Sequence, residues 1–207
     1  MKTKEREIKL NLGCASRLLE DYINIDMDSI VEIKDRYPEI NISESRKFIQ
    51  SDILALPFND NTVDEVRCDS LLEHLSFLEE PRFFYEAQRV LKPGGVLNIS
   101  VPDFEEAVKK WLNAKDNWKE FFRDDEEAIK QEHWFGQYSY SAESRWGYLI
   151  ATIFGPQNGK GQFHKNAYTE SKIKAIYRKI NFNEPKIERF IWKGSRDAML
   201  RVTGTKK

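Results

Sequence analysis

Small and acidic residues follow short apolar runs in the first part of the chain. Gly13-Cys14-Ala15-Ser16 follows the first run, and Asp26 ends the second run thirteen residues after Gly13. Small side chains let a ligand approach the backbone closely, and a carboxylate that ends a strand can accept from both hydroxyls of a ribose. This combination is typical of a site for a nucleoside-containing cofactor.

Acidic residues also follow the next two apolar runs. Asp52 comes just after the third run, and Asp69 follows the fourth at the start of a polar stretch. Open α/β sheets bind ligands at the carboxyl ends of their strands. We therefore expect Asp52 and Asp69 to lie at the same sheet edge as Gly13 and Asp26.

Three histidines, His74, His133 and His164, are candidate proton acceptors near neutral pH. His164 ranks first because it lies in a loop that can face the cofactor. His133, in an aromatic segment, ranks second, and His74, beyond the fourth run, ranks third. Asp103 is the alternative, as a carboxylate base or as a group that orients the substrate. A purely structural role is the competing interpretation for each.

The spacing of cysteines and histidines does not favour a metal site. The chain has two cysteines and three histidines without the short-range spacing of metal ligands, and no cluster of acids and histidines stands out. Cys14 and Cys68 end strands that we expect to be neighbours, so a redox-sensitive pair is one hypothesis. The simpler interpretation is that both are small residues beside the cofactor.

The elements that position these residues are short strands that alternate with helical patterns. Apolar stripes at helical spacing predict a helix that begins near Pro81 and ends before Lys92-Pro93-Gly94-Gly95. This alternation predicts a doubly wound, Rossmann-like α/β fold with about seven strands, mostly parallel, and helices on both faces. The apolar runs predict strands at Ile8 to Leu12, Tyr22 to Ile25, Lys47 to Gln50, Val63 to Cys68 and Gly95 to Val101.

The C-terminal part predicts a helix and a final hairpin. Thr169 suits an N-cap, and apolar residues follow at helical spacing as far as Ile180. Asn181 can adopt the left-handed conformation that closes a helix. Lys186 to Trp192 and Ala198 to Val202 then indicate two antiparallel strands at the edge of the sheet.

The segment from about residue 104 to 166 is rich in aromatic residues and has no strand pattern. We interpret it as a helical insertion or lid within a single domain of residues 1–207. The alternative is that its rings only pack the helices that cover the sheet. Stacking and hydrogen bonding in this segment suit a sugar or another polar small molecule, with candidate side chains Gln137, Tyr138, Tyr140, Gln157 and Asn158.

Composition and charge exclude several classes of protein. The 207 residues carry 33 basic and 34 acidic side chains, and this balance gives no sign of nucleic-acid binding. Apolar runs stay shorter than the ~20 residues of a membrane span, and the charged N-terminus lacks the apolar core of a signal peptide. We therefore expect a cytoplasmic protein without a membrane segment, and the oligomeric state stays open.

Four stretches resemble the class I S-adenosylmethionine-dependent methyltransferases, in the order of that family. They cover Leu10 to Phe104 and read LNLGCAS…NIDMD, SDILALPF, VDEVRCDSLLEHL and LKPGGVLNISVPDF. More narrowly, they are similar to a small, type 11-like subgroup with an "LNLGCG…NVD" opening, and FHKNAYTESKIKAIYRKINF is similar to its tail. Ala15 and Arg17 stand where the family has its second and third glycines. The first crossover is also short, so its helix must be shortened or missing.

The resemblance implies S-adenosylmethionine as the cofactor. At the methionine end, Gly13, Cys14 and Ala15 would pass their backbone along the ligand. Asp69 would lie near the methionine amino group.

The same resemblance implies contacts at the adenosine end. Asp26 would hold the ribose hydroxyls, with Met27 beside the adenine. Asp52 would accept a hydrogen bond from the adenine amino group, and Ile53 would pack on the ring.

These features predict a methyltransferase that acts on a polar small molecule, with O-methylation of a hydroxyl of a sugar, nucleotide sugar or polysaccharide precursor favoured. Methyl transfer gains from orienting the two reactants, and a hydroxyl acceptor must also lose its proton. The main alternative is N-methylation of a small amine or a protein side chain. A nucleotide-binding oxidoreductase is disfavoured because two of the three glycines of its loop are missing. The intact acids Asp26 and Asp52 argue against a non-catalytic binding module.

Overall fold

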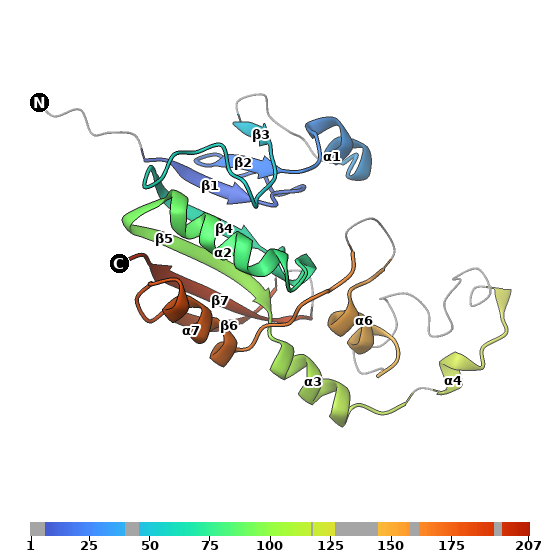
Figure 1. Ribbon diagram of the computed structural model, residues 1–207. Helices are drawn as coiled ribbons and strands as arrows, with labels where there is room; N and C mark the ends of the chain where they lie inside the picture. The colour runs from blue at the N-terminus through green and yellow to red at the C-terminus, as the bar shows by residue number, and fades with distance from the viewer. Residues whose placement is uncertain (1–6, 40–45, 117, 127–144, 158–161, 193–195) are drawn as a thin grey trace, which may run out of the picture.

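The computed structural model describes residues 7–39, 46–116, 118–126, 145–157, 162–192 and 196–207. Five strands pair in parallel: β1 (Lys9–Leu12), β2 (Ile23–Asp26), β3 (Phe48–Gln50), β4 (Val63–Asp69) and β5 (Leu91–Pro102). β7 (Ala198–Thr205) is antiparallel to both β5 and β6 (Lys186–Ile191). The strand order is β3-β2-β1-β4-β5-β7-β6 (Figure 1). The predicted Rossmann-like α/β fold, with its C-terminal antiparallel hairpin, is confirmed.

Two strands are longer than the sequence predicts. β5 begins at Leu91, directly after the preceding helix, and a register shift in its pairing with β4 accommodates the Pro-Gly-Gly sequence. Such irregularities let a strand continue past residues that break its regular pattern. β7 continues past Val202 to Thr205 by pairing with β5, and Gly204 lets the ring of Tyr177 lie directly against the strand.

Side-chain caps begin α1 (Ile30–Arg36), α3 (Phe104–Asn113) and α7 (Glu170–Lys179). Ser29 and Glu32 form a capping box on α1, and Thr169 caps α7 as predicted. Asn181 has a φ of 60° just beyond α7, as expected for the residue that closes it. The remaining helices of the described residues are the 3-10 turn η1 (Leu72–His74), α2 (Glu79–Val90), α4 (Trp118–Phe121) and α6 (Tyr148–Phe154).

The hydrophobic core lies between the sheet and the helices α2 and α7, which cover the same face (Figure 1). Phe83 and Phe84 of α2 and Tyr177 of α7 are almost completely buried against the apolar side chains of the central strands. Alternation along the strands directs polar side chains to the opposite face. There, Glu65 accepts hydrogen bonds from Asn98 at 2.7 Å and from the Tyr22 hydroxyl at 2.8 Å.

The crossover from β1 to β2 has no helix, as its length predicts. The structure describes every residue of this crossover, 13–22, and finds only turns. Two buried asparagines satisfy its backbone instead. Asn24 accepts from the Leu19 N–H at 2.8 Å and from the Asn11 amide at 2.9 Å, and Asn11 also donates to the Arg17 carbonyl at 2.8 Å.

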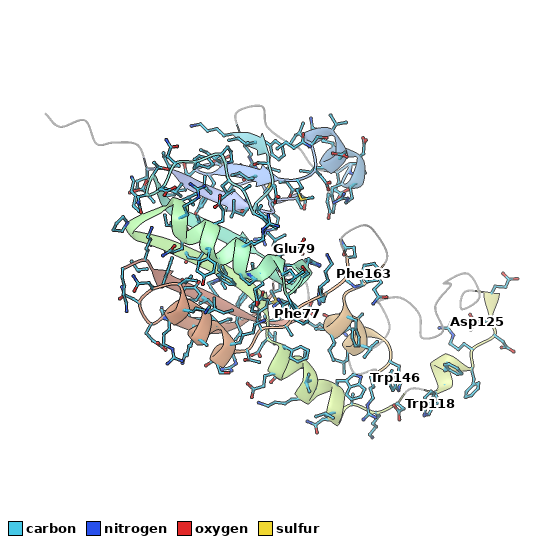
Figure 2. The ribbon with its side chains drawn as sticks, viewed as in Figure 1. Phe77, Glu79, Trp118, Asp125, Trp146 and Phe163 are labelled. Atoms are coloured by element: carbon cyan, nitrogen blue, oxygen red, sulfur yellow. The ribbon has the colours of Figure 1, made fainter. Side chains whose placement is uncertain are left out.

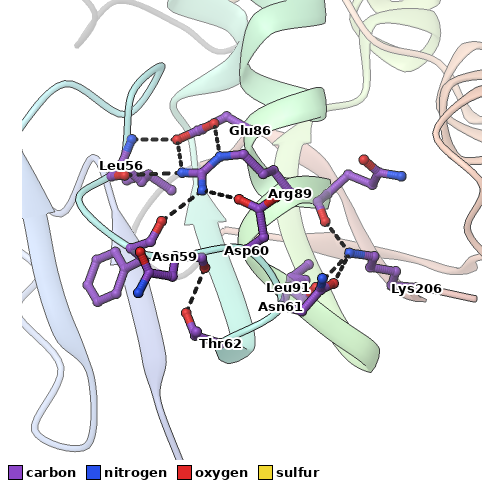
Figure 3. Close-up of polar contacts among 11 residues, drawn as sticks. Leu56, Asn59, Asp60, Asn61, Thr62, Glu86, Arg89, Leu91 and Lys206 are labelled. Carbon is purple, nitrogen blue, oxygen red and sulfur yellow. Dashed lines mark hydrogen bonds and ion pairs between the residues drawn. The ribbon is translucent and has the colours of Figure 1, made fainter.

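The loop from β3 to β4, which begins near Asp52, is fixed to α2 by one arginine (Figure 3). Arg89 donates to the carbonyl oxygens of Leu56 and Phe58, at 3.2 and 2.8 Å, and pairs with Asp60 at 2.7 Å. Glu86 pairs with Arg89 at 2.7 Å and accepts from the Leu56 N–H at 2.6 Å. Arg89 and Glu86 therefore both hold the β3–β4 loop in place.

The segment after β5 runs through α3 and α4 and returns through α6 (Figure 1). The rings of Trp111 and Trp146 stack edge to face at 5.6 Å, and Arg145 donates to the carbonyl oxygen of Ala114 at the end of α3. Figure 2 shows Trp118 and Asp125 at the far end of this segment, away from the sheet. A role as an insertion or lid stays a prediction. Within the described ranges, no helix has the length and apolar character needed to cross a bilayer.

Candidate functional site

The loop after β1 has the tight backbone that its small residues predict. Gly13 has a φ of 61°, in the left-handed region, and a side chain there would place its Cβ 2.6 Å from Cδ2 of Leu71. The Cys14 N–H donates to the carbonyl oxygen of Ile25 at 3.2 Å, which ties the loop to β2. Glycine is therefore required at position 13 by both the backbone and the neighbouring side chain.

Asp26, the last residue of β2, braces this loop. One carboxylate oxygen accepts from the Ala15 N–H at 2.8 Å, and the other accepts from the Asp28 N–H at 3.0 Å. An ionised carboxylate has about four acceptor positions, so two remain for a ligand. Asp26 thus combines a structural role with the capacity to bind two hydroxyl groups.

The residues expected at the adenine lie beside Asp26. Its partner on β3 is Gln50, and the exposed Asp52 follows two residues later. Ile53 is buried in the core, and Met27 is 66% exposed. Gly13, Asp26 and Asp52 thus follow adjacent strands at one edge of the sheet, as predicted.

A cavity of about 160 Å³ lies between the Gly13 loop and the end of β4. Asp69 lines it and pairs with Arg67 at 2.8 Å and with Arg17 at 3.8 Å. The guanidinium of Arg17 also stacks 4.4 Å from the centre of the Trp192 ring. Trp192 was not predicted at this site, because it comes from the other end of the chain.

A second cavity, of about 800 Å³, lies next to the first. Ser70 and Trp192 line both cavities. The second cavity also contains Glu73, His74 and His164 in its wall. Two of the predicted proton acceptors are therefore brought together, and Glu73 is a residue that the sequence analysis missed. The feature that could have indicated Glu73 is a single carboxylate beside His74 in the otherwise apolar stretch Leu71-Leu72-Glu73-His74-Leu75.

Glu73, His74 and His164 form a compact polar cluster. The two imidazole rings meet edge to face at 5.1 Å, and potential ligand atoms of the three residues lie within 4.8 Å of one another. His74 Nδ1 lies 3.0 Å from the Phe163 carbonyl oxygen, and His164 Nδ1 lies 3.1 Å from that of Thr152. These contacts fix the orientation of both rings.

Burial controls the protonation of this cluster. It raises the pKa of Glu73 to about 8 and lowers the pKa values of His74 and His164 below 6.5. The neighbouring His74 lowers the pKa of His164 further. Both imidazoles are therefore neutral near pH 7 and can accept a proton or donate a lone pair.

The other predicted residues have different surroundings. Asp103 caps α3 through the Glu106 N–H at 3.2 Å and pairs with Arg189 at 2.9 Å, so both of its oxygens are engaged. His133 lies outside the described residues, as do Gln137, Tyr138, Tyr140 and Asn158.

Cys14 and Cys68 are free, buried thiols. Burial and the charge of Asp26 raise the pKa of Cys14 to about 12, and burial also raises the pKa of Cys68. Thiolates are the reactive species in disulfide chemistry, so these environments suit inert packing residues. The redox-sensitive pair stays a hypothesis.

Comparison with known proteins shows which family the first half of the chain resembles. Residues 10–99 match the model of a methyltransferase domain family. A probable S-adenosylmethionine-dependent methyltransferase from Mycobacterium tuberculosis is 30% identical over 94 residues, 44% of this chain and 30% of that protein. Residues 10–99 thus resemble the methyltransferase domain of S-adenosylmethionine-dependent methyltransferases. An uncharacterized protein from Methanocaldococcus jannaschii is 32% identical over 111 residues, 52% of this chain and 46% of that protein. The chain thus spans less than half the length of these relatives.

Solved structures share the fold of this chain. The PH0226 protein from Pyrococcus horikoshii superposes with a TM-score of 0.57 at 19% identity, covering all of this chain and 84% of that one. A 1,6-didemethyltoxoflavin-N1-methyltransferase from Burkholderia thailandensis, solved with bound S-adenosylhomocysteine, gives 0.56 at 14% identity, covering 98% and 72%.

The donor set at the sheet edge fits S-adenosylmethionine. Asp26 keeps acceptor positions for ribose hydroxyls, and the exposed Asp52 can accept from an amino group. At the smaller cavity, Asp69 offers a carboxylate for an ammonium group and Arg17 a guanidinium for a carboxylate. The ammonium and the carboxylate of the cofactor thus each have an oppositely charged side chain.

Proposed function

We propose that this protein transfers a methyl group from S-adenosylmethionine to a hydroxyl of a polar small molecule. The observation that carries the proposal is the wall of Ser70 and Trp192 shared by the two cavities. It supports a cofactor whose methionine end occupies the smaller cavity while an acceptor occupies the larger one. Bringing two reactants together in a fixed orientation supplies much of the rate enhancement in such a reaction.

The cofactor-binding residues orient the reactive end. Asp26 holds the ribose, Asp52 the adenine amino group, and the backbone of Gly13, Cys14 and Ala15 passes along the methionine part. When bound, the cofactor supplies a methyl group on a positively charged sulfur, open to attack opposite the carbon–sulfur bond.

The carboxylate and the guanidinium in the smaller cavity fix the amino acid part of the cofactor. Asp69 faces its ammonium group and Arg17 its carboxylate, and Trp192 supports the Arg17 side chain by stacking. These three contacts hold the methionine end beside the larger cavity.

The Glu73–His74–His164 cluster removes the proton of the acceptor hydroxyl. His164 is the first candidate because it is neutral near pH 7 and its ring is oriented through Nδ1. Its Nε2 accepts the proton. His133 stays the second candidate, and His74 ranks after both. Both carboxylate oxygens of Asp103 are engaged, so we assign Asp103 to orienting the substrate and not to accepting its proton.

The acceptor is a sugar, a nucleotide sugar or a polysaccharide precursor. The larger cavity combines the Trp192 ring with polar groups from Tyr148, Gln162, Arg196 and Asp197. Aromatic faces and hydrogen-bonding side chains together suit a polyhydroxylated ligand. The second candidate is a small amine, because the carboxylate of Asp197 in the same wall can attract a cationic nitrogen.

Calorimetry and a methyl-acceptor screen test the proposal. We expect the purified protein to bind S-adenosylhomocysteine with one site per chain and not to bind NAD. Labelled S-adenosylmethionine should then transfer its methyl group to members of a panel of sugars and nucleotide sugars. Absence of S-adenosylhomocysteine binding contradicts the proposal as a whole. Transfer to the amines of a parallel panel, and not to the sugars, contradicts the hydroxyl acceptor.

A further inference from the structure

The most unusual polar atom in the larger cavity is a carboxylate oxygen of Glu73. Glu73 is 3% exposed, and its Oε2 is completely buried without a hydrogen-bond partner among the residues that the structure describes. An unpartnered polar atom in such a place costs about 1–3 kcal/mol, and more when it is charged. A ligand that binds this oxygen therefore removes a cost that the folded chain otherwise carries.

The two neighbouring imidazoles have their lone pairs on the outer nitrogen. Nδ1 of His74 and Nδ1 of His164 each lie within hydrogen-bond distance of a backbone carbonyl, at 3.0 and 3.1 Å. A carbonyl oxygen only accepts, so Nδ1 carries the hydrogen and Nε2 is the free acceptor in each ring. A hydrogen bond from one ring nitrogen to a carbonyl is the usual way in which proteins orient a metal-binding histidine.

We propose that Glu73, His74 and His164 bind a divalent transition-metal ion, with Zn²⁺ as the best match. Two imidazole nitrogens and one carboxylate oxygen form a ligand set that proteins use for catalytic zinc, where a fourth position stays open. The three potential ligand atoms lie within 4.8 Å of one another. Tetrahedral zinc with bonds of about 2.0–2.1 Å requires its ligand atoms to lie about 3.3 Å from one another. Side-chain rotations that move each ligand atom by about 1 Å therefore complete the site.

The open position of this ion faces the larger cavity, because all three residues line it. The role of the ion, unlike its binding, rests on the proposed function. An acceptor hydroxyl at the open position has a lower pKa and releases its proton to water in the cavity. Its oxygen lone pair then forms the bond to the methyl carbon, while the pair of the broken carbon–sulfur bond stays on the sulfur. Nothing is oxidised or reduced, and His164 then acts as a ligand instead of a base.

Metal titration of the chelator-treated protein tests the site directly. Zn²⁺ should bind with one equivalent per chain in calorimetry, and Co²⁺ should give the visible absorption of a site with nitrogen and oxygen ligands. Glu73→Gln and His164→Gln should each weaken Zn²⁺ binding by about 100-fold or more, since even changes behind the ligands cost 10–100-fold. Glu105→Gln is the matched control, because Glu105 forms an exposed pair with Lys109 on α3.

The outcomes separate this inference from the proposed function. The metal site is refuted if Zn²⁺ fails to bind, or if Glu73→Gln and His164→Gln bind it as tightly as the control while circular dichroism shows both folded. Binding of Mg²⁺ in preference to Zn²⁺ also refutes it, because Mg²⁺ selects oxygen ligands. S-adenosylhomocysteine binding is measured with and without Zn²⁺ on the same samples. Absence of S-adenosylhomocysteine binding in both samples contradicts the methyltransferase proposal. It does not change the conclusion about the metal site.

Discussion

Replacing Asp26 tests the cofactor site most directly. The carboxylate accepts from the Ala15 and Asp28 N–H groups at 2.8 and 3.0 Å and keeps two positions for the ribose hydroxyls. A hydrogen bond to a charged group contributes about 1.5–3 kcal/mol, so two of them contribute about 3–6 kcal/mol. Asp26→Ala should therefore weaken S-adenosylhomocysteine binding by at least about 100-fold, since 1.4 kcal/mol is a factor of ten. Asp26→Asn removes the charge and keeps one acceptor, so it should lose about 10–100-fold.

Isothermal calorimetry with S-adenosylhomocysteine measures these affinities, and thermal unfolding reports the loss of the two loop contacts separately. Asp21→Asn is the matched control, because Asp21 is an exposed aspartate in the same crossover, at the opposite end of β2. Its affinity should stay within about twofold of the wild type. If folded Asp26→Ala binds S-adenosylhomocysteine within threefold of the wild type, Asp26 does not hold the ribose, and the assignment of this sheet edge is refuted.

Three further changes probe the loop anchor, the methionine end and the acceptor cavity. Arg89→Met should lower the free energy of unfolding by about 2 kcal/mol, because it removes the contacts that hold the β3–β4 loop. Arg89 lowers the pKa of Glu86 below 4.5, so this stabilisation is present above pH 4.5 and lost as the pH falls through the lowered pKa. Denaturant unfolding should show the difference between wild type and variant shrinking as the pH falls through the lowered pKa of Glu86, and a constant difference would contradict the pairing. Arg17→Ala should weaken S-adenosylhomocysteine binding by about tenfold and leave 5′-methylthioadenosine, which lacks the amino acid part, unchanged in calorimetry; equal losses would exclude a contact with the carboxylate. His164→Ala should reduce kcat by about 10²–10⁴-fold and retain S-adenosylhomocysteine affinity, and unchanged turnover would remove His164 from the reaction.

The sheet and the cofactor edge could be predicted because their signals are local. Strand patterns, the glycine at position 13 and the acid that ends β2 each depend on a few consecutive residues, and parallel pairing then brings the strand ends together. The absent crossover helix followed from chain length alone. The buried asparagines Asn11 and Asn24 that replace it were not predicted, because each looks like an ordinary polar residue within an apolar run.

The larger cavity could be predicted only in part, because the residues that line it come from segments far apart in the sequence. Glu73 and His74 follow β4, whereas His164 precedes α7 and Trp192 follows β6. Spacing along the chain carries no trace of such a cluster, so the sequence indicated three separate histidines and no metal ligands. Burial was also invisible, and it is burial that leaves the Glu73 oxygen without a partner.

In the proposed function, the end of β4 determines how donor and acceptor meet. Asp69 lines the smaller cavity, Ser70 lines both, and Glu73 and His74 line the larger one, so six consecutive residues connect the two compartments. Ser70 has a φ of 51°, which turns the chain sharply between the two cavities. The Ser70 N–H donates a hydrogen bond to the carbonyl oxygen of Ser100 on β5 at 2.9 Å. A non-glycine residue in this region is strained and persists only where the surrounding structure fixes it. The strain is located where the distance between the methionine end and the acceptor is defined. A rigid turn here therefore serves methyl transfer, which depends on that distance more than on any single proton acceptor.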